Sequence, residues 1–327
     1  MTTIADIAKL AGVAKSTVSR YLNDGSVSGA TKKKIERVIN ETGYAPNAFA
    51  QSLKAKNTNI IGTIVPRLDS YAASHTLIGI DEQLKELNYQ MLISNSNQNL
   101  ETEIENIYTL AKQKVAGIIL LAAEVTSLHL EAFLKIDIPV LLVGQEHEKV
   151  YSVVHDDYKA AHEMGKYILA NGHKRIAYLG VTEKDIAVGV KRKAGFKDSM
   201  ASAVDCKVNY YETGFNIAEA LEQVPEIIDT FHPTIIVCAT DNIAIGAMKA
   251  ASLKGYSIPK DLSITGFGGY EITGMIHPGL TTAKFFYKEA GQLAARNIVK
   301  LVREEELELL NVSGFQLIVR ESVDILV

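Results

Sequence analysis

The sequence predicts a small all-α module at the N-terminus, followed by a larger α/β body of two lobes with parallel sheets. Three observations predict this fold class. At about 150 residues per domain, the length of 327 residues corresponds to two or three domains. The N-terminal residues repeat with helical periodicity, whereas from Asn59 onward short apolar runs alternate with helical patterns. The composition, with 47% hydrophobic and 22% charged residues, is that of a folded protein and excludes a disordered chain.

Cysteine content and hydropathy exclude several classes of protein. Cys206 and Cys238 are too few for a disulfide framework, and no Cys/His cluster offers zinc a tetrahedral set, so we expect neither a metal nor a cofactor. No apolar run approaches the ~20 residues needed to span a bilayer, and the N-terminus lacks the pattern of a signal peptide. We therefore expect a cytoplasmic protein with no membrane partner.

The charge is distributed unevenly along the chain. Residues 1–58 hold nine basic and four acidic residues, a net charge of +5, and the remainder holds 25 basic and 34 acidic residues, a net charge of -9. A basic module on an acidic body is typical of a chain of which one end meets a polyanion. A solvated basic face with no partner is the alternative.

The first elements are expected to be three short helices. Residues 3–11 place four apolar residues at helical spacing: Ile4, Ile7, Ala8 and Ala11. Thr2 or Thr3 is available as the N-cap, and Gly12 ends this helix. Residues 14–22 form a second helix with a polar face made of Lys15, Ser16, Ser19 and Arg20. A third helix, at about residues 31–42, holds the pair through Ile35, Val38 and Ile39.

Two helices joined by a tight turn form a helix-turn-helix, a motif that reads double-stranded DNA. The N-terminal part of the second helix enters the major groove, where Lys15 can donate to guanine and Ser16 can contact a base edge or a phosphate. The loop from Asn23 to Ser28 supplies hydroxyl and amide groups suited to phosphate contacts.

The body is expected to contain two parallel sheets. Apolar runs predict strands at residues 60–65, 90–94, 117–121, 140–143, 175–180, 235–238 and 262–266. Helical patterns lie near residues 76–88, 101–113, 158–171, 191–203, 216–230 and 241–254. This alternation predicts sheets with helices on both faces, and the strands fall into two sets. A ligand is expected in the cleft outside the carboxyl ends of the strands.

Polar residues that follow these strands are the candidates for ligand binding. They are Arg67, Asp69, Ser70, Gln145, His155, Thr240 and Asp241. Lys191 and Arg192 open a helix after a glycine turn at Gly189. Two simpler interpretations stay open, because Thr240 or Asp241 could only cap the next helix and residues 191–193 could be a solvated charge run.

The N-terminal motifs resemble the head of the lactose-repressor (LacI/GalR) family of bacterial transcription regulators. The matching segments are Ile4-Ala5-Asp6-Ile7-Ala8, Ala11-Gly12-Val13, Ser16-Thr17-Val18-Ser19-Arg20, Leu22-Asn23 and Gly43-Tyr44-Ala45-Pro46-Asn47. The resemblance implies that Lys15 and Ser16 read bases and that Arg20 contacts DNA. It places phosphate contacts at Thr3, Ser19, Asn23, Ser28, Thr31 and Asn47. It also implies a hinge helix that includes Ala50, Leu53 and Lys54, with Leu53 wedged into the minor groove.

The resemblance implies a domain organisation over the whole chain. Residues 1–46 are the DNA-binding domain, residues 47–58 the hinge, and residues 59–327 a periplasmic-binding-protein-like body. Its N-lobe comprises residues 59–156 and 286–313, and its C-lobe residues 157–284 and 315–327. The chain crosses between the lobes near Asp157, Lys284 and Gly314.

The same resemblance implies a sugar as the effector. Arg192 matches an arginine that reads sugar hydroxyls, and Phe215 lies near an aromatic residue that stacks on a sugar ring. Gly268 stands where the family often has an aspartate. Arg67 and Ser70, together with Lys191, suit a phosphate. Several stretches are most similar to sucrose-operon repressors of Gram-positive bacteria, and others to trehalose-type repressors that respond to a sugar phosphate. The expected effectors are sucrose, its 6-phosphate or fructose.

The expected working unit is a homodimer on a pseudo-palindromic operator, because two recognition helices must meet two half-sites. No heptad tail that would make a tetramer precedes Val327. An enzyme is the alternative from another class, since residues 266–271 resemble a dinucleotide fingerprint, but position 271 is Glu instead of Gly. An exported sugar-binding protein would share the body and lack the helix-turn-helix. A regulator that needs a phosphoprotein partner stays open.

Overall fold

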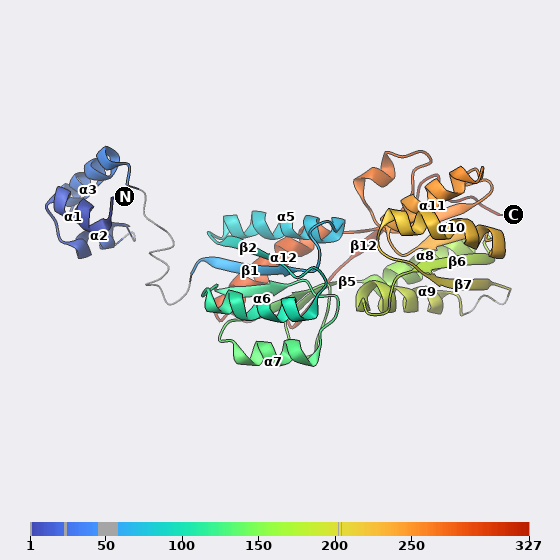
Figure 1. The fold of residues 1–327 in the computed structure, drawn as a ribbon, viewed down its shortest axis with the longest axis horizontal. Coiled ribbons are helices and arrows are strands. Elements are labelled where there is room, and N and C mark those ends of the chain that lie inside the picture. Colours follow the sequence, from blue (N-terminus) through green and yellow to red (C-terminus); the bar gives the residue numbers. More distant parts are fainter. Residues whose placement is uncertain (1, 23–24, 45–57, 202, 204, 327) are drawn as a thin grey trace. The chain divides into compact units, whose positions relative to one another are not determined.

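The chain divides into two compact units, residues 1–58 and residues 59–327. The computed structural model describes residues 2–22, 25–44, 58–201, 203 and 205–326. The predicted fold class is confirmed, with an all-α helix-turn-helix unit and a two-lobed α/β body with parallel sheets (Figure 1). Among the described residues, none of the helices combines the length and the hydropathy that crossing a membrane requires.

The first unit contains helices α1 (Ile4–Ala11), α2 (Lys15–Leu22) and α3 (Gly29–Thr42). Thr3 is the N-cap of α1, and Gly12, at φ +65°, ends that helix. Ser28 caps α3, which therefore begins two residues before the expected start. Apolar side chains of the three helices form one small core: Ile7, Ala8, Ala11, Val18, Ile35 and Val38. The core holds α2 so that its first turn stays exposed.

The first lobe of the body is a parallel sheet with helices on both faces. Its strand order is β11-β5-β4-β3-β1-β2. The strands are β1 (Ile60–Val65), β2 (Gln90–Asn95), β3 (Gly117–Leu120), β4 (Val140–Val143), β5 (Ser152–His155) and β11 (Leu310–Ser313). Helices α5 (Tyr71–Glu86) and α12 (Tyr287–Val302) pack on one face, and α6 (Leu100–Lys112) and α7 (Ser127–Lys135) on the other.

The second lobe repeats this design with one antiparallel strand. Its strand order is β12-β10-β9-β8-β6-β7, and β12 runs antiparallel to β10. The strands are β6 (Arg175–Gly180), β7 (Lys207–Glu212), β8 (Ile235–Cys238), β9 (Ser263–Gly268), β10 (Thr281–Phe285) and β12 (Phe315–Ile318). Helices α8 (Asp157–Ala170) and α9 (Lys193–Ser199) cover one face, and α10 (Ile217–Phe231) and α11 (Asp241–Leu253) the other.

The chain passes between the lobes three times. It leaves the first lobe after β5, returns after β10, and crosses again between β11 and β12. All three crossings lie at the carboxyl ends of the parallel strands. The polar residues that follow these strands lie at the same edge of each sheet. This edge is therefore a joint as well as a binding surface.

Several elements differ from the sequence prediction. Strands β7, β10, β11 and β12 and helices α7 and α12 were not expected. The edge strands β7, β11 and β12 alternate exposed and partly buried residues, so they contain no continuous apolar run. Gly189 is not a turn, because it lies inside the π-helical segment η1 (Ile186–Arg192). Helix α5 begins at Tyr71 instead of near residue 76, since Ser70 caps it.

Two glycines explain how α12 packs against α5. A Cβ on Gly79 would lie 2.0 Å from the carbonyl oxygen of Lys288, and one on Gly291 would lie 2.1 Å from that of Thr76. The two backbones approach each other at both positions, which only glycine permits. This contact fixes the N-terminus of α12, where Tyr287 faces the cleft.

Candidate functional site

The exposed face of α2 carries the predicted base-reading residues. Lys15 and Ser16 occupy its first turn and are exposed, and Arg20 is exposed in its last turn. Two predicted phosphate contacts, Thr3 and Ser28, also cap helices. Thr3 forms a capping box with Asp6, and the hydroxyl oxygens of Ser28 and Thr31 lie 2.9 Å apart at the start of α3. Asn23, Asn47, Ala50, Leu53 and Lys54 lie outside the described residues.

A cleft lies between the two lobes of the body, at the carboxyl ends of their parallel strands. The space between its walls, including the solvent-open part at its mouth, is about 1070 Å³. The structure brings together these predicted residues: Arg67, Ser70, Gln145, His155, Arg192, Phe215 and Thr240. Both lobes contribute, so a ligand there would touch each of them.

Arg192 is the most deeply held of the cleft residues. Its guanidinium lies 5.0 Å from the ring centroids of both Phe267 and Phe285. Its Nε donates to Asp157 Oδ1 at 3.1 Å, its Nη2 donates to the same oxygen, and its Nη1 donates to the carbonyl of Ala239. A guanidinium has five N–H groups, so two remain for a ligand. The positive charge is already paired, which suits hydroxyl groups better than an anion.

One buried polar atom at the cleft lacks a protein partner. The His155 ring packs against the rings of Phe285 and Tyr287, and its Nδ1 makes no hydrogen bond among the described residues. Burial lowers the pKa of His155, which favours the neutral imidazole. A buried polar atom without a partner is costly, so a ligand that donates to His155 Nδ1 would satisfy it. Gln145, which is 5% exposed, adds an amide to the cleft lining.

Two predicted residues point away from the cleft. The Asp69 side chain is 83% exposed and lies 3.7 Å from Arg67. Lys191 Nζ lies 2.7 Å from Glu146 Oε1, and Lys191 does not line the cleft. The prediction that Lys191 helps to bind a ligand phosphate is therefore not supported by its position, because a carboxylate from the other lobe already neutralises it.

Two further predicted residues are buried behind the cleft wall. Asp241 is fully buried, and its carboxylate accepts hydrogen bonds from Thr282 Oγ1 at 2.6 Å and from the Tyr270 N–H at 2.8 Å. Burial raises the pKa of Asp241 to about 6, and the hydrogen bond from Thr282 opposes this shift. Gly268 lies under the ring of Tyr270 and does not line the cleft. Both residues shape the wall without reaching the ligand space.

Thr240 and Ser70 have both of the roles that the sequence left open. Thr240 Oγ1 accepts from the N–H of Ile243 and caps α11, and Ser70 Oγ accepts from the N–H of Ala73 and caps α5. Both also line the cleft. Because parallel strands end and helices begin at the same edge, a helix cap is also a wall residue there.

Sequence reasoning missed several cleft residues. They are Gln98, Tyr71, Asp157, Asp185, Asn242, Tyr270 and Tyr287. Tyr71 was assigned to a loop because the helix was expected to begin near residue 76. Tyr287 begins a helix that was not predicted. Asn242 directly follows Asp241, and Asp157 was named only as a crossing between the lobes, so their positions in the sequence were the available signal.

Among the described residues, at least four contacts cross the cleft from lobe to lobe. Two are partly exposed, the ion pair of Lys191 with Glu146 and the stacking of Arg67 over Phe215, 5.1 Å from the ring centroid. The third is a backbone hydrogen bond of 3.4 Å from Ile186 N to the Ala123 oxygen. The fourth is a stack between Tyr71 and Tyr270. Exposed ion pairs contribute roughly 0–1 kcal/mol, so the aromatic contacts are expected to matter more.

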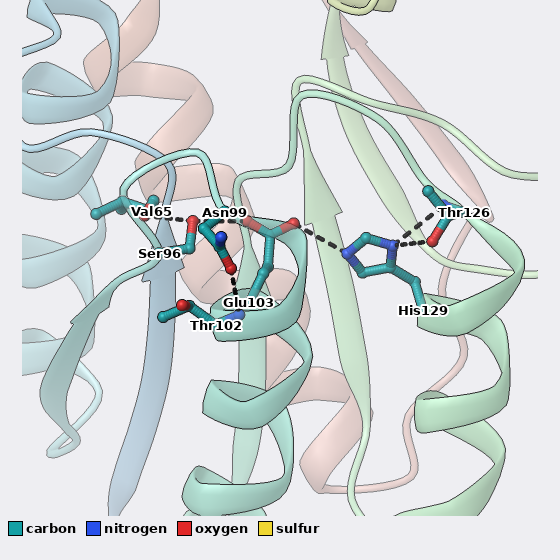
Figure 2. A network of polar contacts seen from close by, with 7 residues as sticks. All are labelled: Val65, Ser96, Asn99, Thr102, Glu103, Thr126 and His129. Carbon is teal, nitrogen blue, oxygen red and sulfur yellow. Dashed lines mark hydrogen bonds and ion pairs between the residues drawn. The ribbon is translucent and has the colours of Figure 1, made fainter.

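A buried polar network supports the first-lobe wall of the cleft (Figure 2). Glu103 accepts from Ser96 Oγ at 2.8 Å, and its other oxygen lies 2.9 Å from His129 Nε2. His129 Nδ1 accepts from Thr126 N, which assigns the ring proton to Nε2. The network ties together the loops on either side of it, which contribute Gln98 and Ala123 to the cleft. It explains how two loops form one wall.

Comparisons with known proteins match both units. Residues 3–47 match the model of bacterial regulatory proteins of the lacI family, and residues 58–315 match that of periplasmic binding proteins and the sugar binding domain of the LacI family. The chain is 41% identical to the sucrose operon repressor of Staphylococcus xylosus, over 94% of this chain and 96% of the repressor. It is 30% identical to catabolite control protein A of Priestia megaterium, over 94% of each chain.

A solved structure shows the same fold. The crystal structure of the Lac repressor dimer bound to operator and the anti-inducer ONPF aligns with a TM-score of 0.92 at 23% identity, covering 99% of each chain. The curated relatives are transcriptional regulators and not enzymes. The family models together span most of the sequence in the family's order, and the chain is therefore a DNA-binding regulator of the LacI family.

Proposed function

We propose that this protein is a cytoplasmic repressor of a sucrose-utilisation operon and that a sugar in the cleft releases it from DNA. It binds a pseudo-palindromic operator as a homodimer through the exposed face of α2. The observation that carries the proposal is the cleft, where His155 Nδ1 lacks a partner among the described residues and Arg192 has two N–H groups left for a ligand. The similarity to a protein named sucrose operon repressor supports the choice of sugar.

The chemistry of the cleft favours a neutral sugar. Among the described residues that line it, the cationic side chains are Arg67 and Arg192, and Arg192 is paired with Asp157. His155 is kept neutral by burial. Hydroxyl groups can donate to His155 Nδ1 and accept from the two free N–H groups of Arg192, whereas a phosphate would rely on Arg67 alone. Sucrose or fructose therefore fits better than sucrose 6-phosphate.

A sugar phosphate, as in trehalose-type repressors, is the second candidate. Arg67 favours it, because its guanidinium lies at the cleft mouth beside Ser70, and guanidinium groups bind phosphate in a bidentate manner. Substitution of Arg67 by alanine separates the two candidates. It should abolish the advantage of a phosphorylated sugar, and it should leave the affinity for a neutral sugar within about threefold, since cation–π contacts at exposed sites contribute roughly 0.5–1 kcal/mol.

The experiment is a thermal-shift panel on the full chain with sucrose, fructose and trehalose and with the 6-phosphate of each. A ligand at 100 times its Kd stabilises the folded state by ~2.7 kcal/mol, which is readily measured. Stabilisation by sucrose or fructose is the expected result. A shift with a phosphosugar alone would favour the second candidate, and no shift with any of the six would overturn the proposed effector class.

A further inference from the structure

Two tyrosines from opposite lobes stack on each other at the cleft. Tyr71 is the first residue of α5, and Tyr270 directly precedes the short helix η2 (Glu271–Gly274). Their ring centroids lie 3.9 Å apart with an interplanar angle of 24°. Tyr71 also stacks on His75, at 3.8 Å, so three rings form a continuous stack. The two tyrosines are called the aromatic clasp below.

The second lobe holds Tyr270 in place with two residues that were expected to contact ligand. Asp241 accepts the Tyr270 N–H at 2.8 Å. Gly268 has φ +141°, and a Cβ on it would lie 2.3 Å from Tyr270 Cε1. A side chain at position 268 would therefore displace the ring. The buried carboxylate and the glycine together position Tyr270 against the first lobe.

The clasp continues a hydrophobic core across the joint. Phe267, Tyr270 and Phe285 of the second lobe form one core cluster with Tyr287 of the first lobe, and Tyr71 and Ala72 of the first lobe pack against it. Tyr270 is only 7% exposed. The ion pair between Lys191 and Glu146, in contrast, is partly open to solvent and is screened by water and salt. The aromatic contact is thus the more buried of these two lobe-to-lobe contacts.

We propose that Tyr71 and Tyr270 are positioning residues that hold the lobes closed and select a neutral, polyhydroxylated ligand. Both tyrosines line the cleft, so a ligand there lies beside the clasp. Loss of either ring frees the lobes to separate. The selection of ligand rests on the proposed function, whereas the closure of the lobes does not.

Hydrogen exchange of the full chain tests the closure without a ligand. The amide of Ile186 donates to Ala123 across the lobes, so its exchange reports their separation. Tyr71→Ala and Tyr270→Ala should each accelerate exchange there at least fivefold, and the double variant should exchange no faster than the faster single variant. Tyr158→Ala is the matched control, because Tyr158 stacks on His162 within one lobe. Wild-type exchange in both single variants, or multiplicative effects in the double variant, would overturn the clasp.

Exchange in strand β8 shows whether a variant has lost its fold. If Tyr270→Ala also accelerates exchange in β8, Gly268→Ala decides the question, since it displaces the ring and keeps the tyrosine. Its control is Gly255→Ala, at φ +82° with no atom within 4 Å of the added Cβ. The clasp requires faster exchange at Ile186 in Gly268→Ala and wild-type exchange there in Gly255→Ala. Equal exchange in these two variants contradicts it.

Titration with sucrose tests the selection of ligand. Tyr71→Ala and Tyr270→Ala should each weaken sucrose binding about tenfold or more, and Tyr158→Ala should not change it. Equal affinities in the wild type and both clasp variants would contradict the role in selection. If the wild type does not bind sucrose, the proposed effector is wrong, and the exchange experiment still decides whether the clasp closes the lobes.

Discussion

The two walls of the cleft differ in how their polar groups are satisfied. In the second-lobe wall, Arg192 is bonded to Asp157 and to Ala239, and Asp241 is bonded to Thr282 and Tyr270. On the other side, His155 Nδ1 is buried without such a partner among the described residues. The second-lobe wall is therefore part of the folded core, whereas the opposite wall depends on a ligand for its missing hydrogen bond.

The largest effect is expected where the second-lobe wall loses a buried charge. Asp157→Asn leaves the Arg192 guanidinium, in a side chain that is 4% exposed, without its counter-charge. Removing one partner of a buried ion pair costs about 3–5 kcal/mol, so Tm should fall by ~10 °C. Thermal and urea denaturation measure this loss.

Asp229→Asn is the control, because it removes an exposed ion pair with Lys254 at 2.8 Å. Exposed pairs contribute about 1 kcal/mol at most. Equal losses of unfolding free energy in Asp157→Asn and Asp229→Asn would contradict the larger contribution expected of the buried ion pair.

A pH-dependent effect of similar size is expected from Asp241. Its pKa is about 6 in the folded protein, because of burial, against 3.8 for the unfolded chain. Between these values the folded state binds the extra proton, so the contribution of Asp241 to stability falls by ~2 kcal/mol as pH rises from 4 to 6. Asp241→Asn should lack this fall. Urea denaturation from pH 4 to 7 checks it, and parallel profiles for wild type and variant would refute the assignment.

A smaller effect on stability and a clear effect on binding are expected at His155. His155→Phe removes an unpaired buried nitrogen from an aromatic surrounding, so the free energy of unfolding should stay unchanged or rise by about 1 kcal/mol. Sugar affinity should fall about tenfold, since the ligand loses a hydrogen bond worth ~1.4 kcal/mol. Calorimetry and urea denaturation measure the two quantities.

His173→Phe is the matched control for His155→Phe. His173 is buried outside the cleft with both ring nitrogens bonded, at 3.0 Å to Thr234 and at 3.2 Å to the Asp324 carbonyl. Its replacement should lower stability and leave sugar binding intact. If His155→Phe lowered stability without affecting sugar binding, and His173→Phe weakened sugar binding instead, the account of the two histidines would be wrong.

The smallest effect is expected for Lys191→Ala. The pair with Glu146 is partly exposed, with side-chain exposures of 33% and 44%, and exposed pairs contribute roughly 0–1 kcal/mol. Stability, sugar affinity and the response to a phosphosugar should change little. If Lys191→Ala weakened phosphosugar binding more than Arg67→Ala does, Lys191 would be a ligand-binding residue after all.

Most of the fold could be predicted from the sequence because the signals are local. The helices of the first unit follow from apolar spacing and from Gly12, and the central strands of both sheets are continuous apolar runs. The edge strand β11 gave no such signal, since half of its residues face solvent. Helix α5 began earlier than expected because Ser70, and not a later residue, caps it.

The candidate site could be predicted only in part. Arg67, Gln145 and His155 were identified because they lie at or just after the ends of parallel strands. Such strands all end at one edge of their sheet. It could not show that Glu146 neutralises Lys191 or that Asp241 turns toward Tyr270, since those partners come from distant segments. Tyr287 was missed because its helix returns to the cleft from the far end of the sequence.

The most direct test of the account links the cleft to DNA. An operator duplex is selected from random sequences with the full chain, and its affinity is measured by fluorescence anisotropy as sucrose is added. The account predicts that sucrose weakens operator binding by the wild type. It predicts that His155→Phe binds the operator equally well without sugar and needs about tenfold more sucrose for release. Tighter operator binding with sucrose, or an identical response of the two proteins, would contradict it.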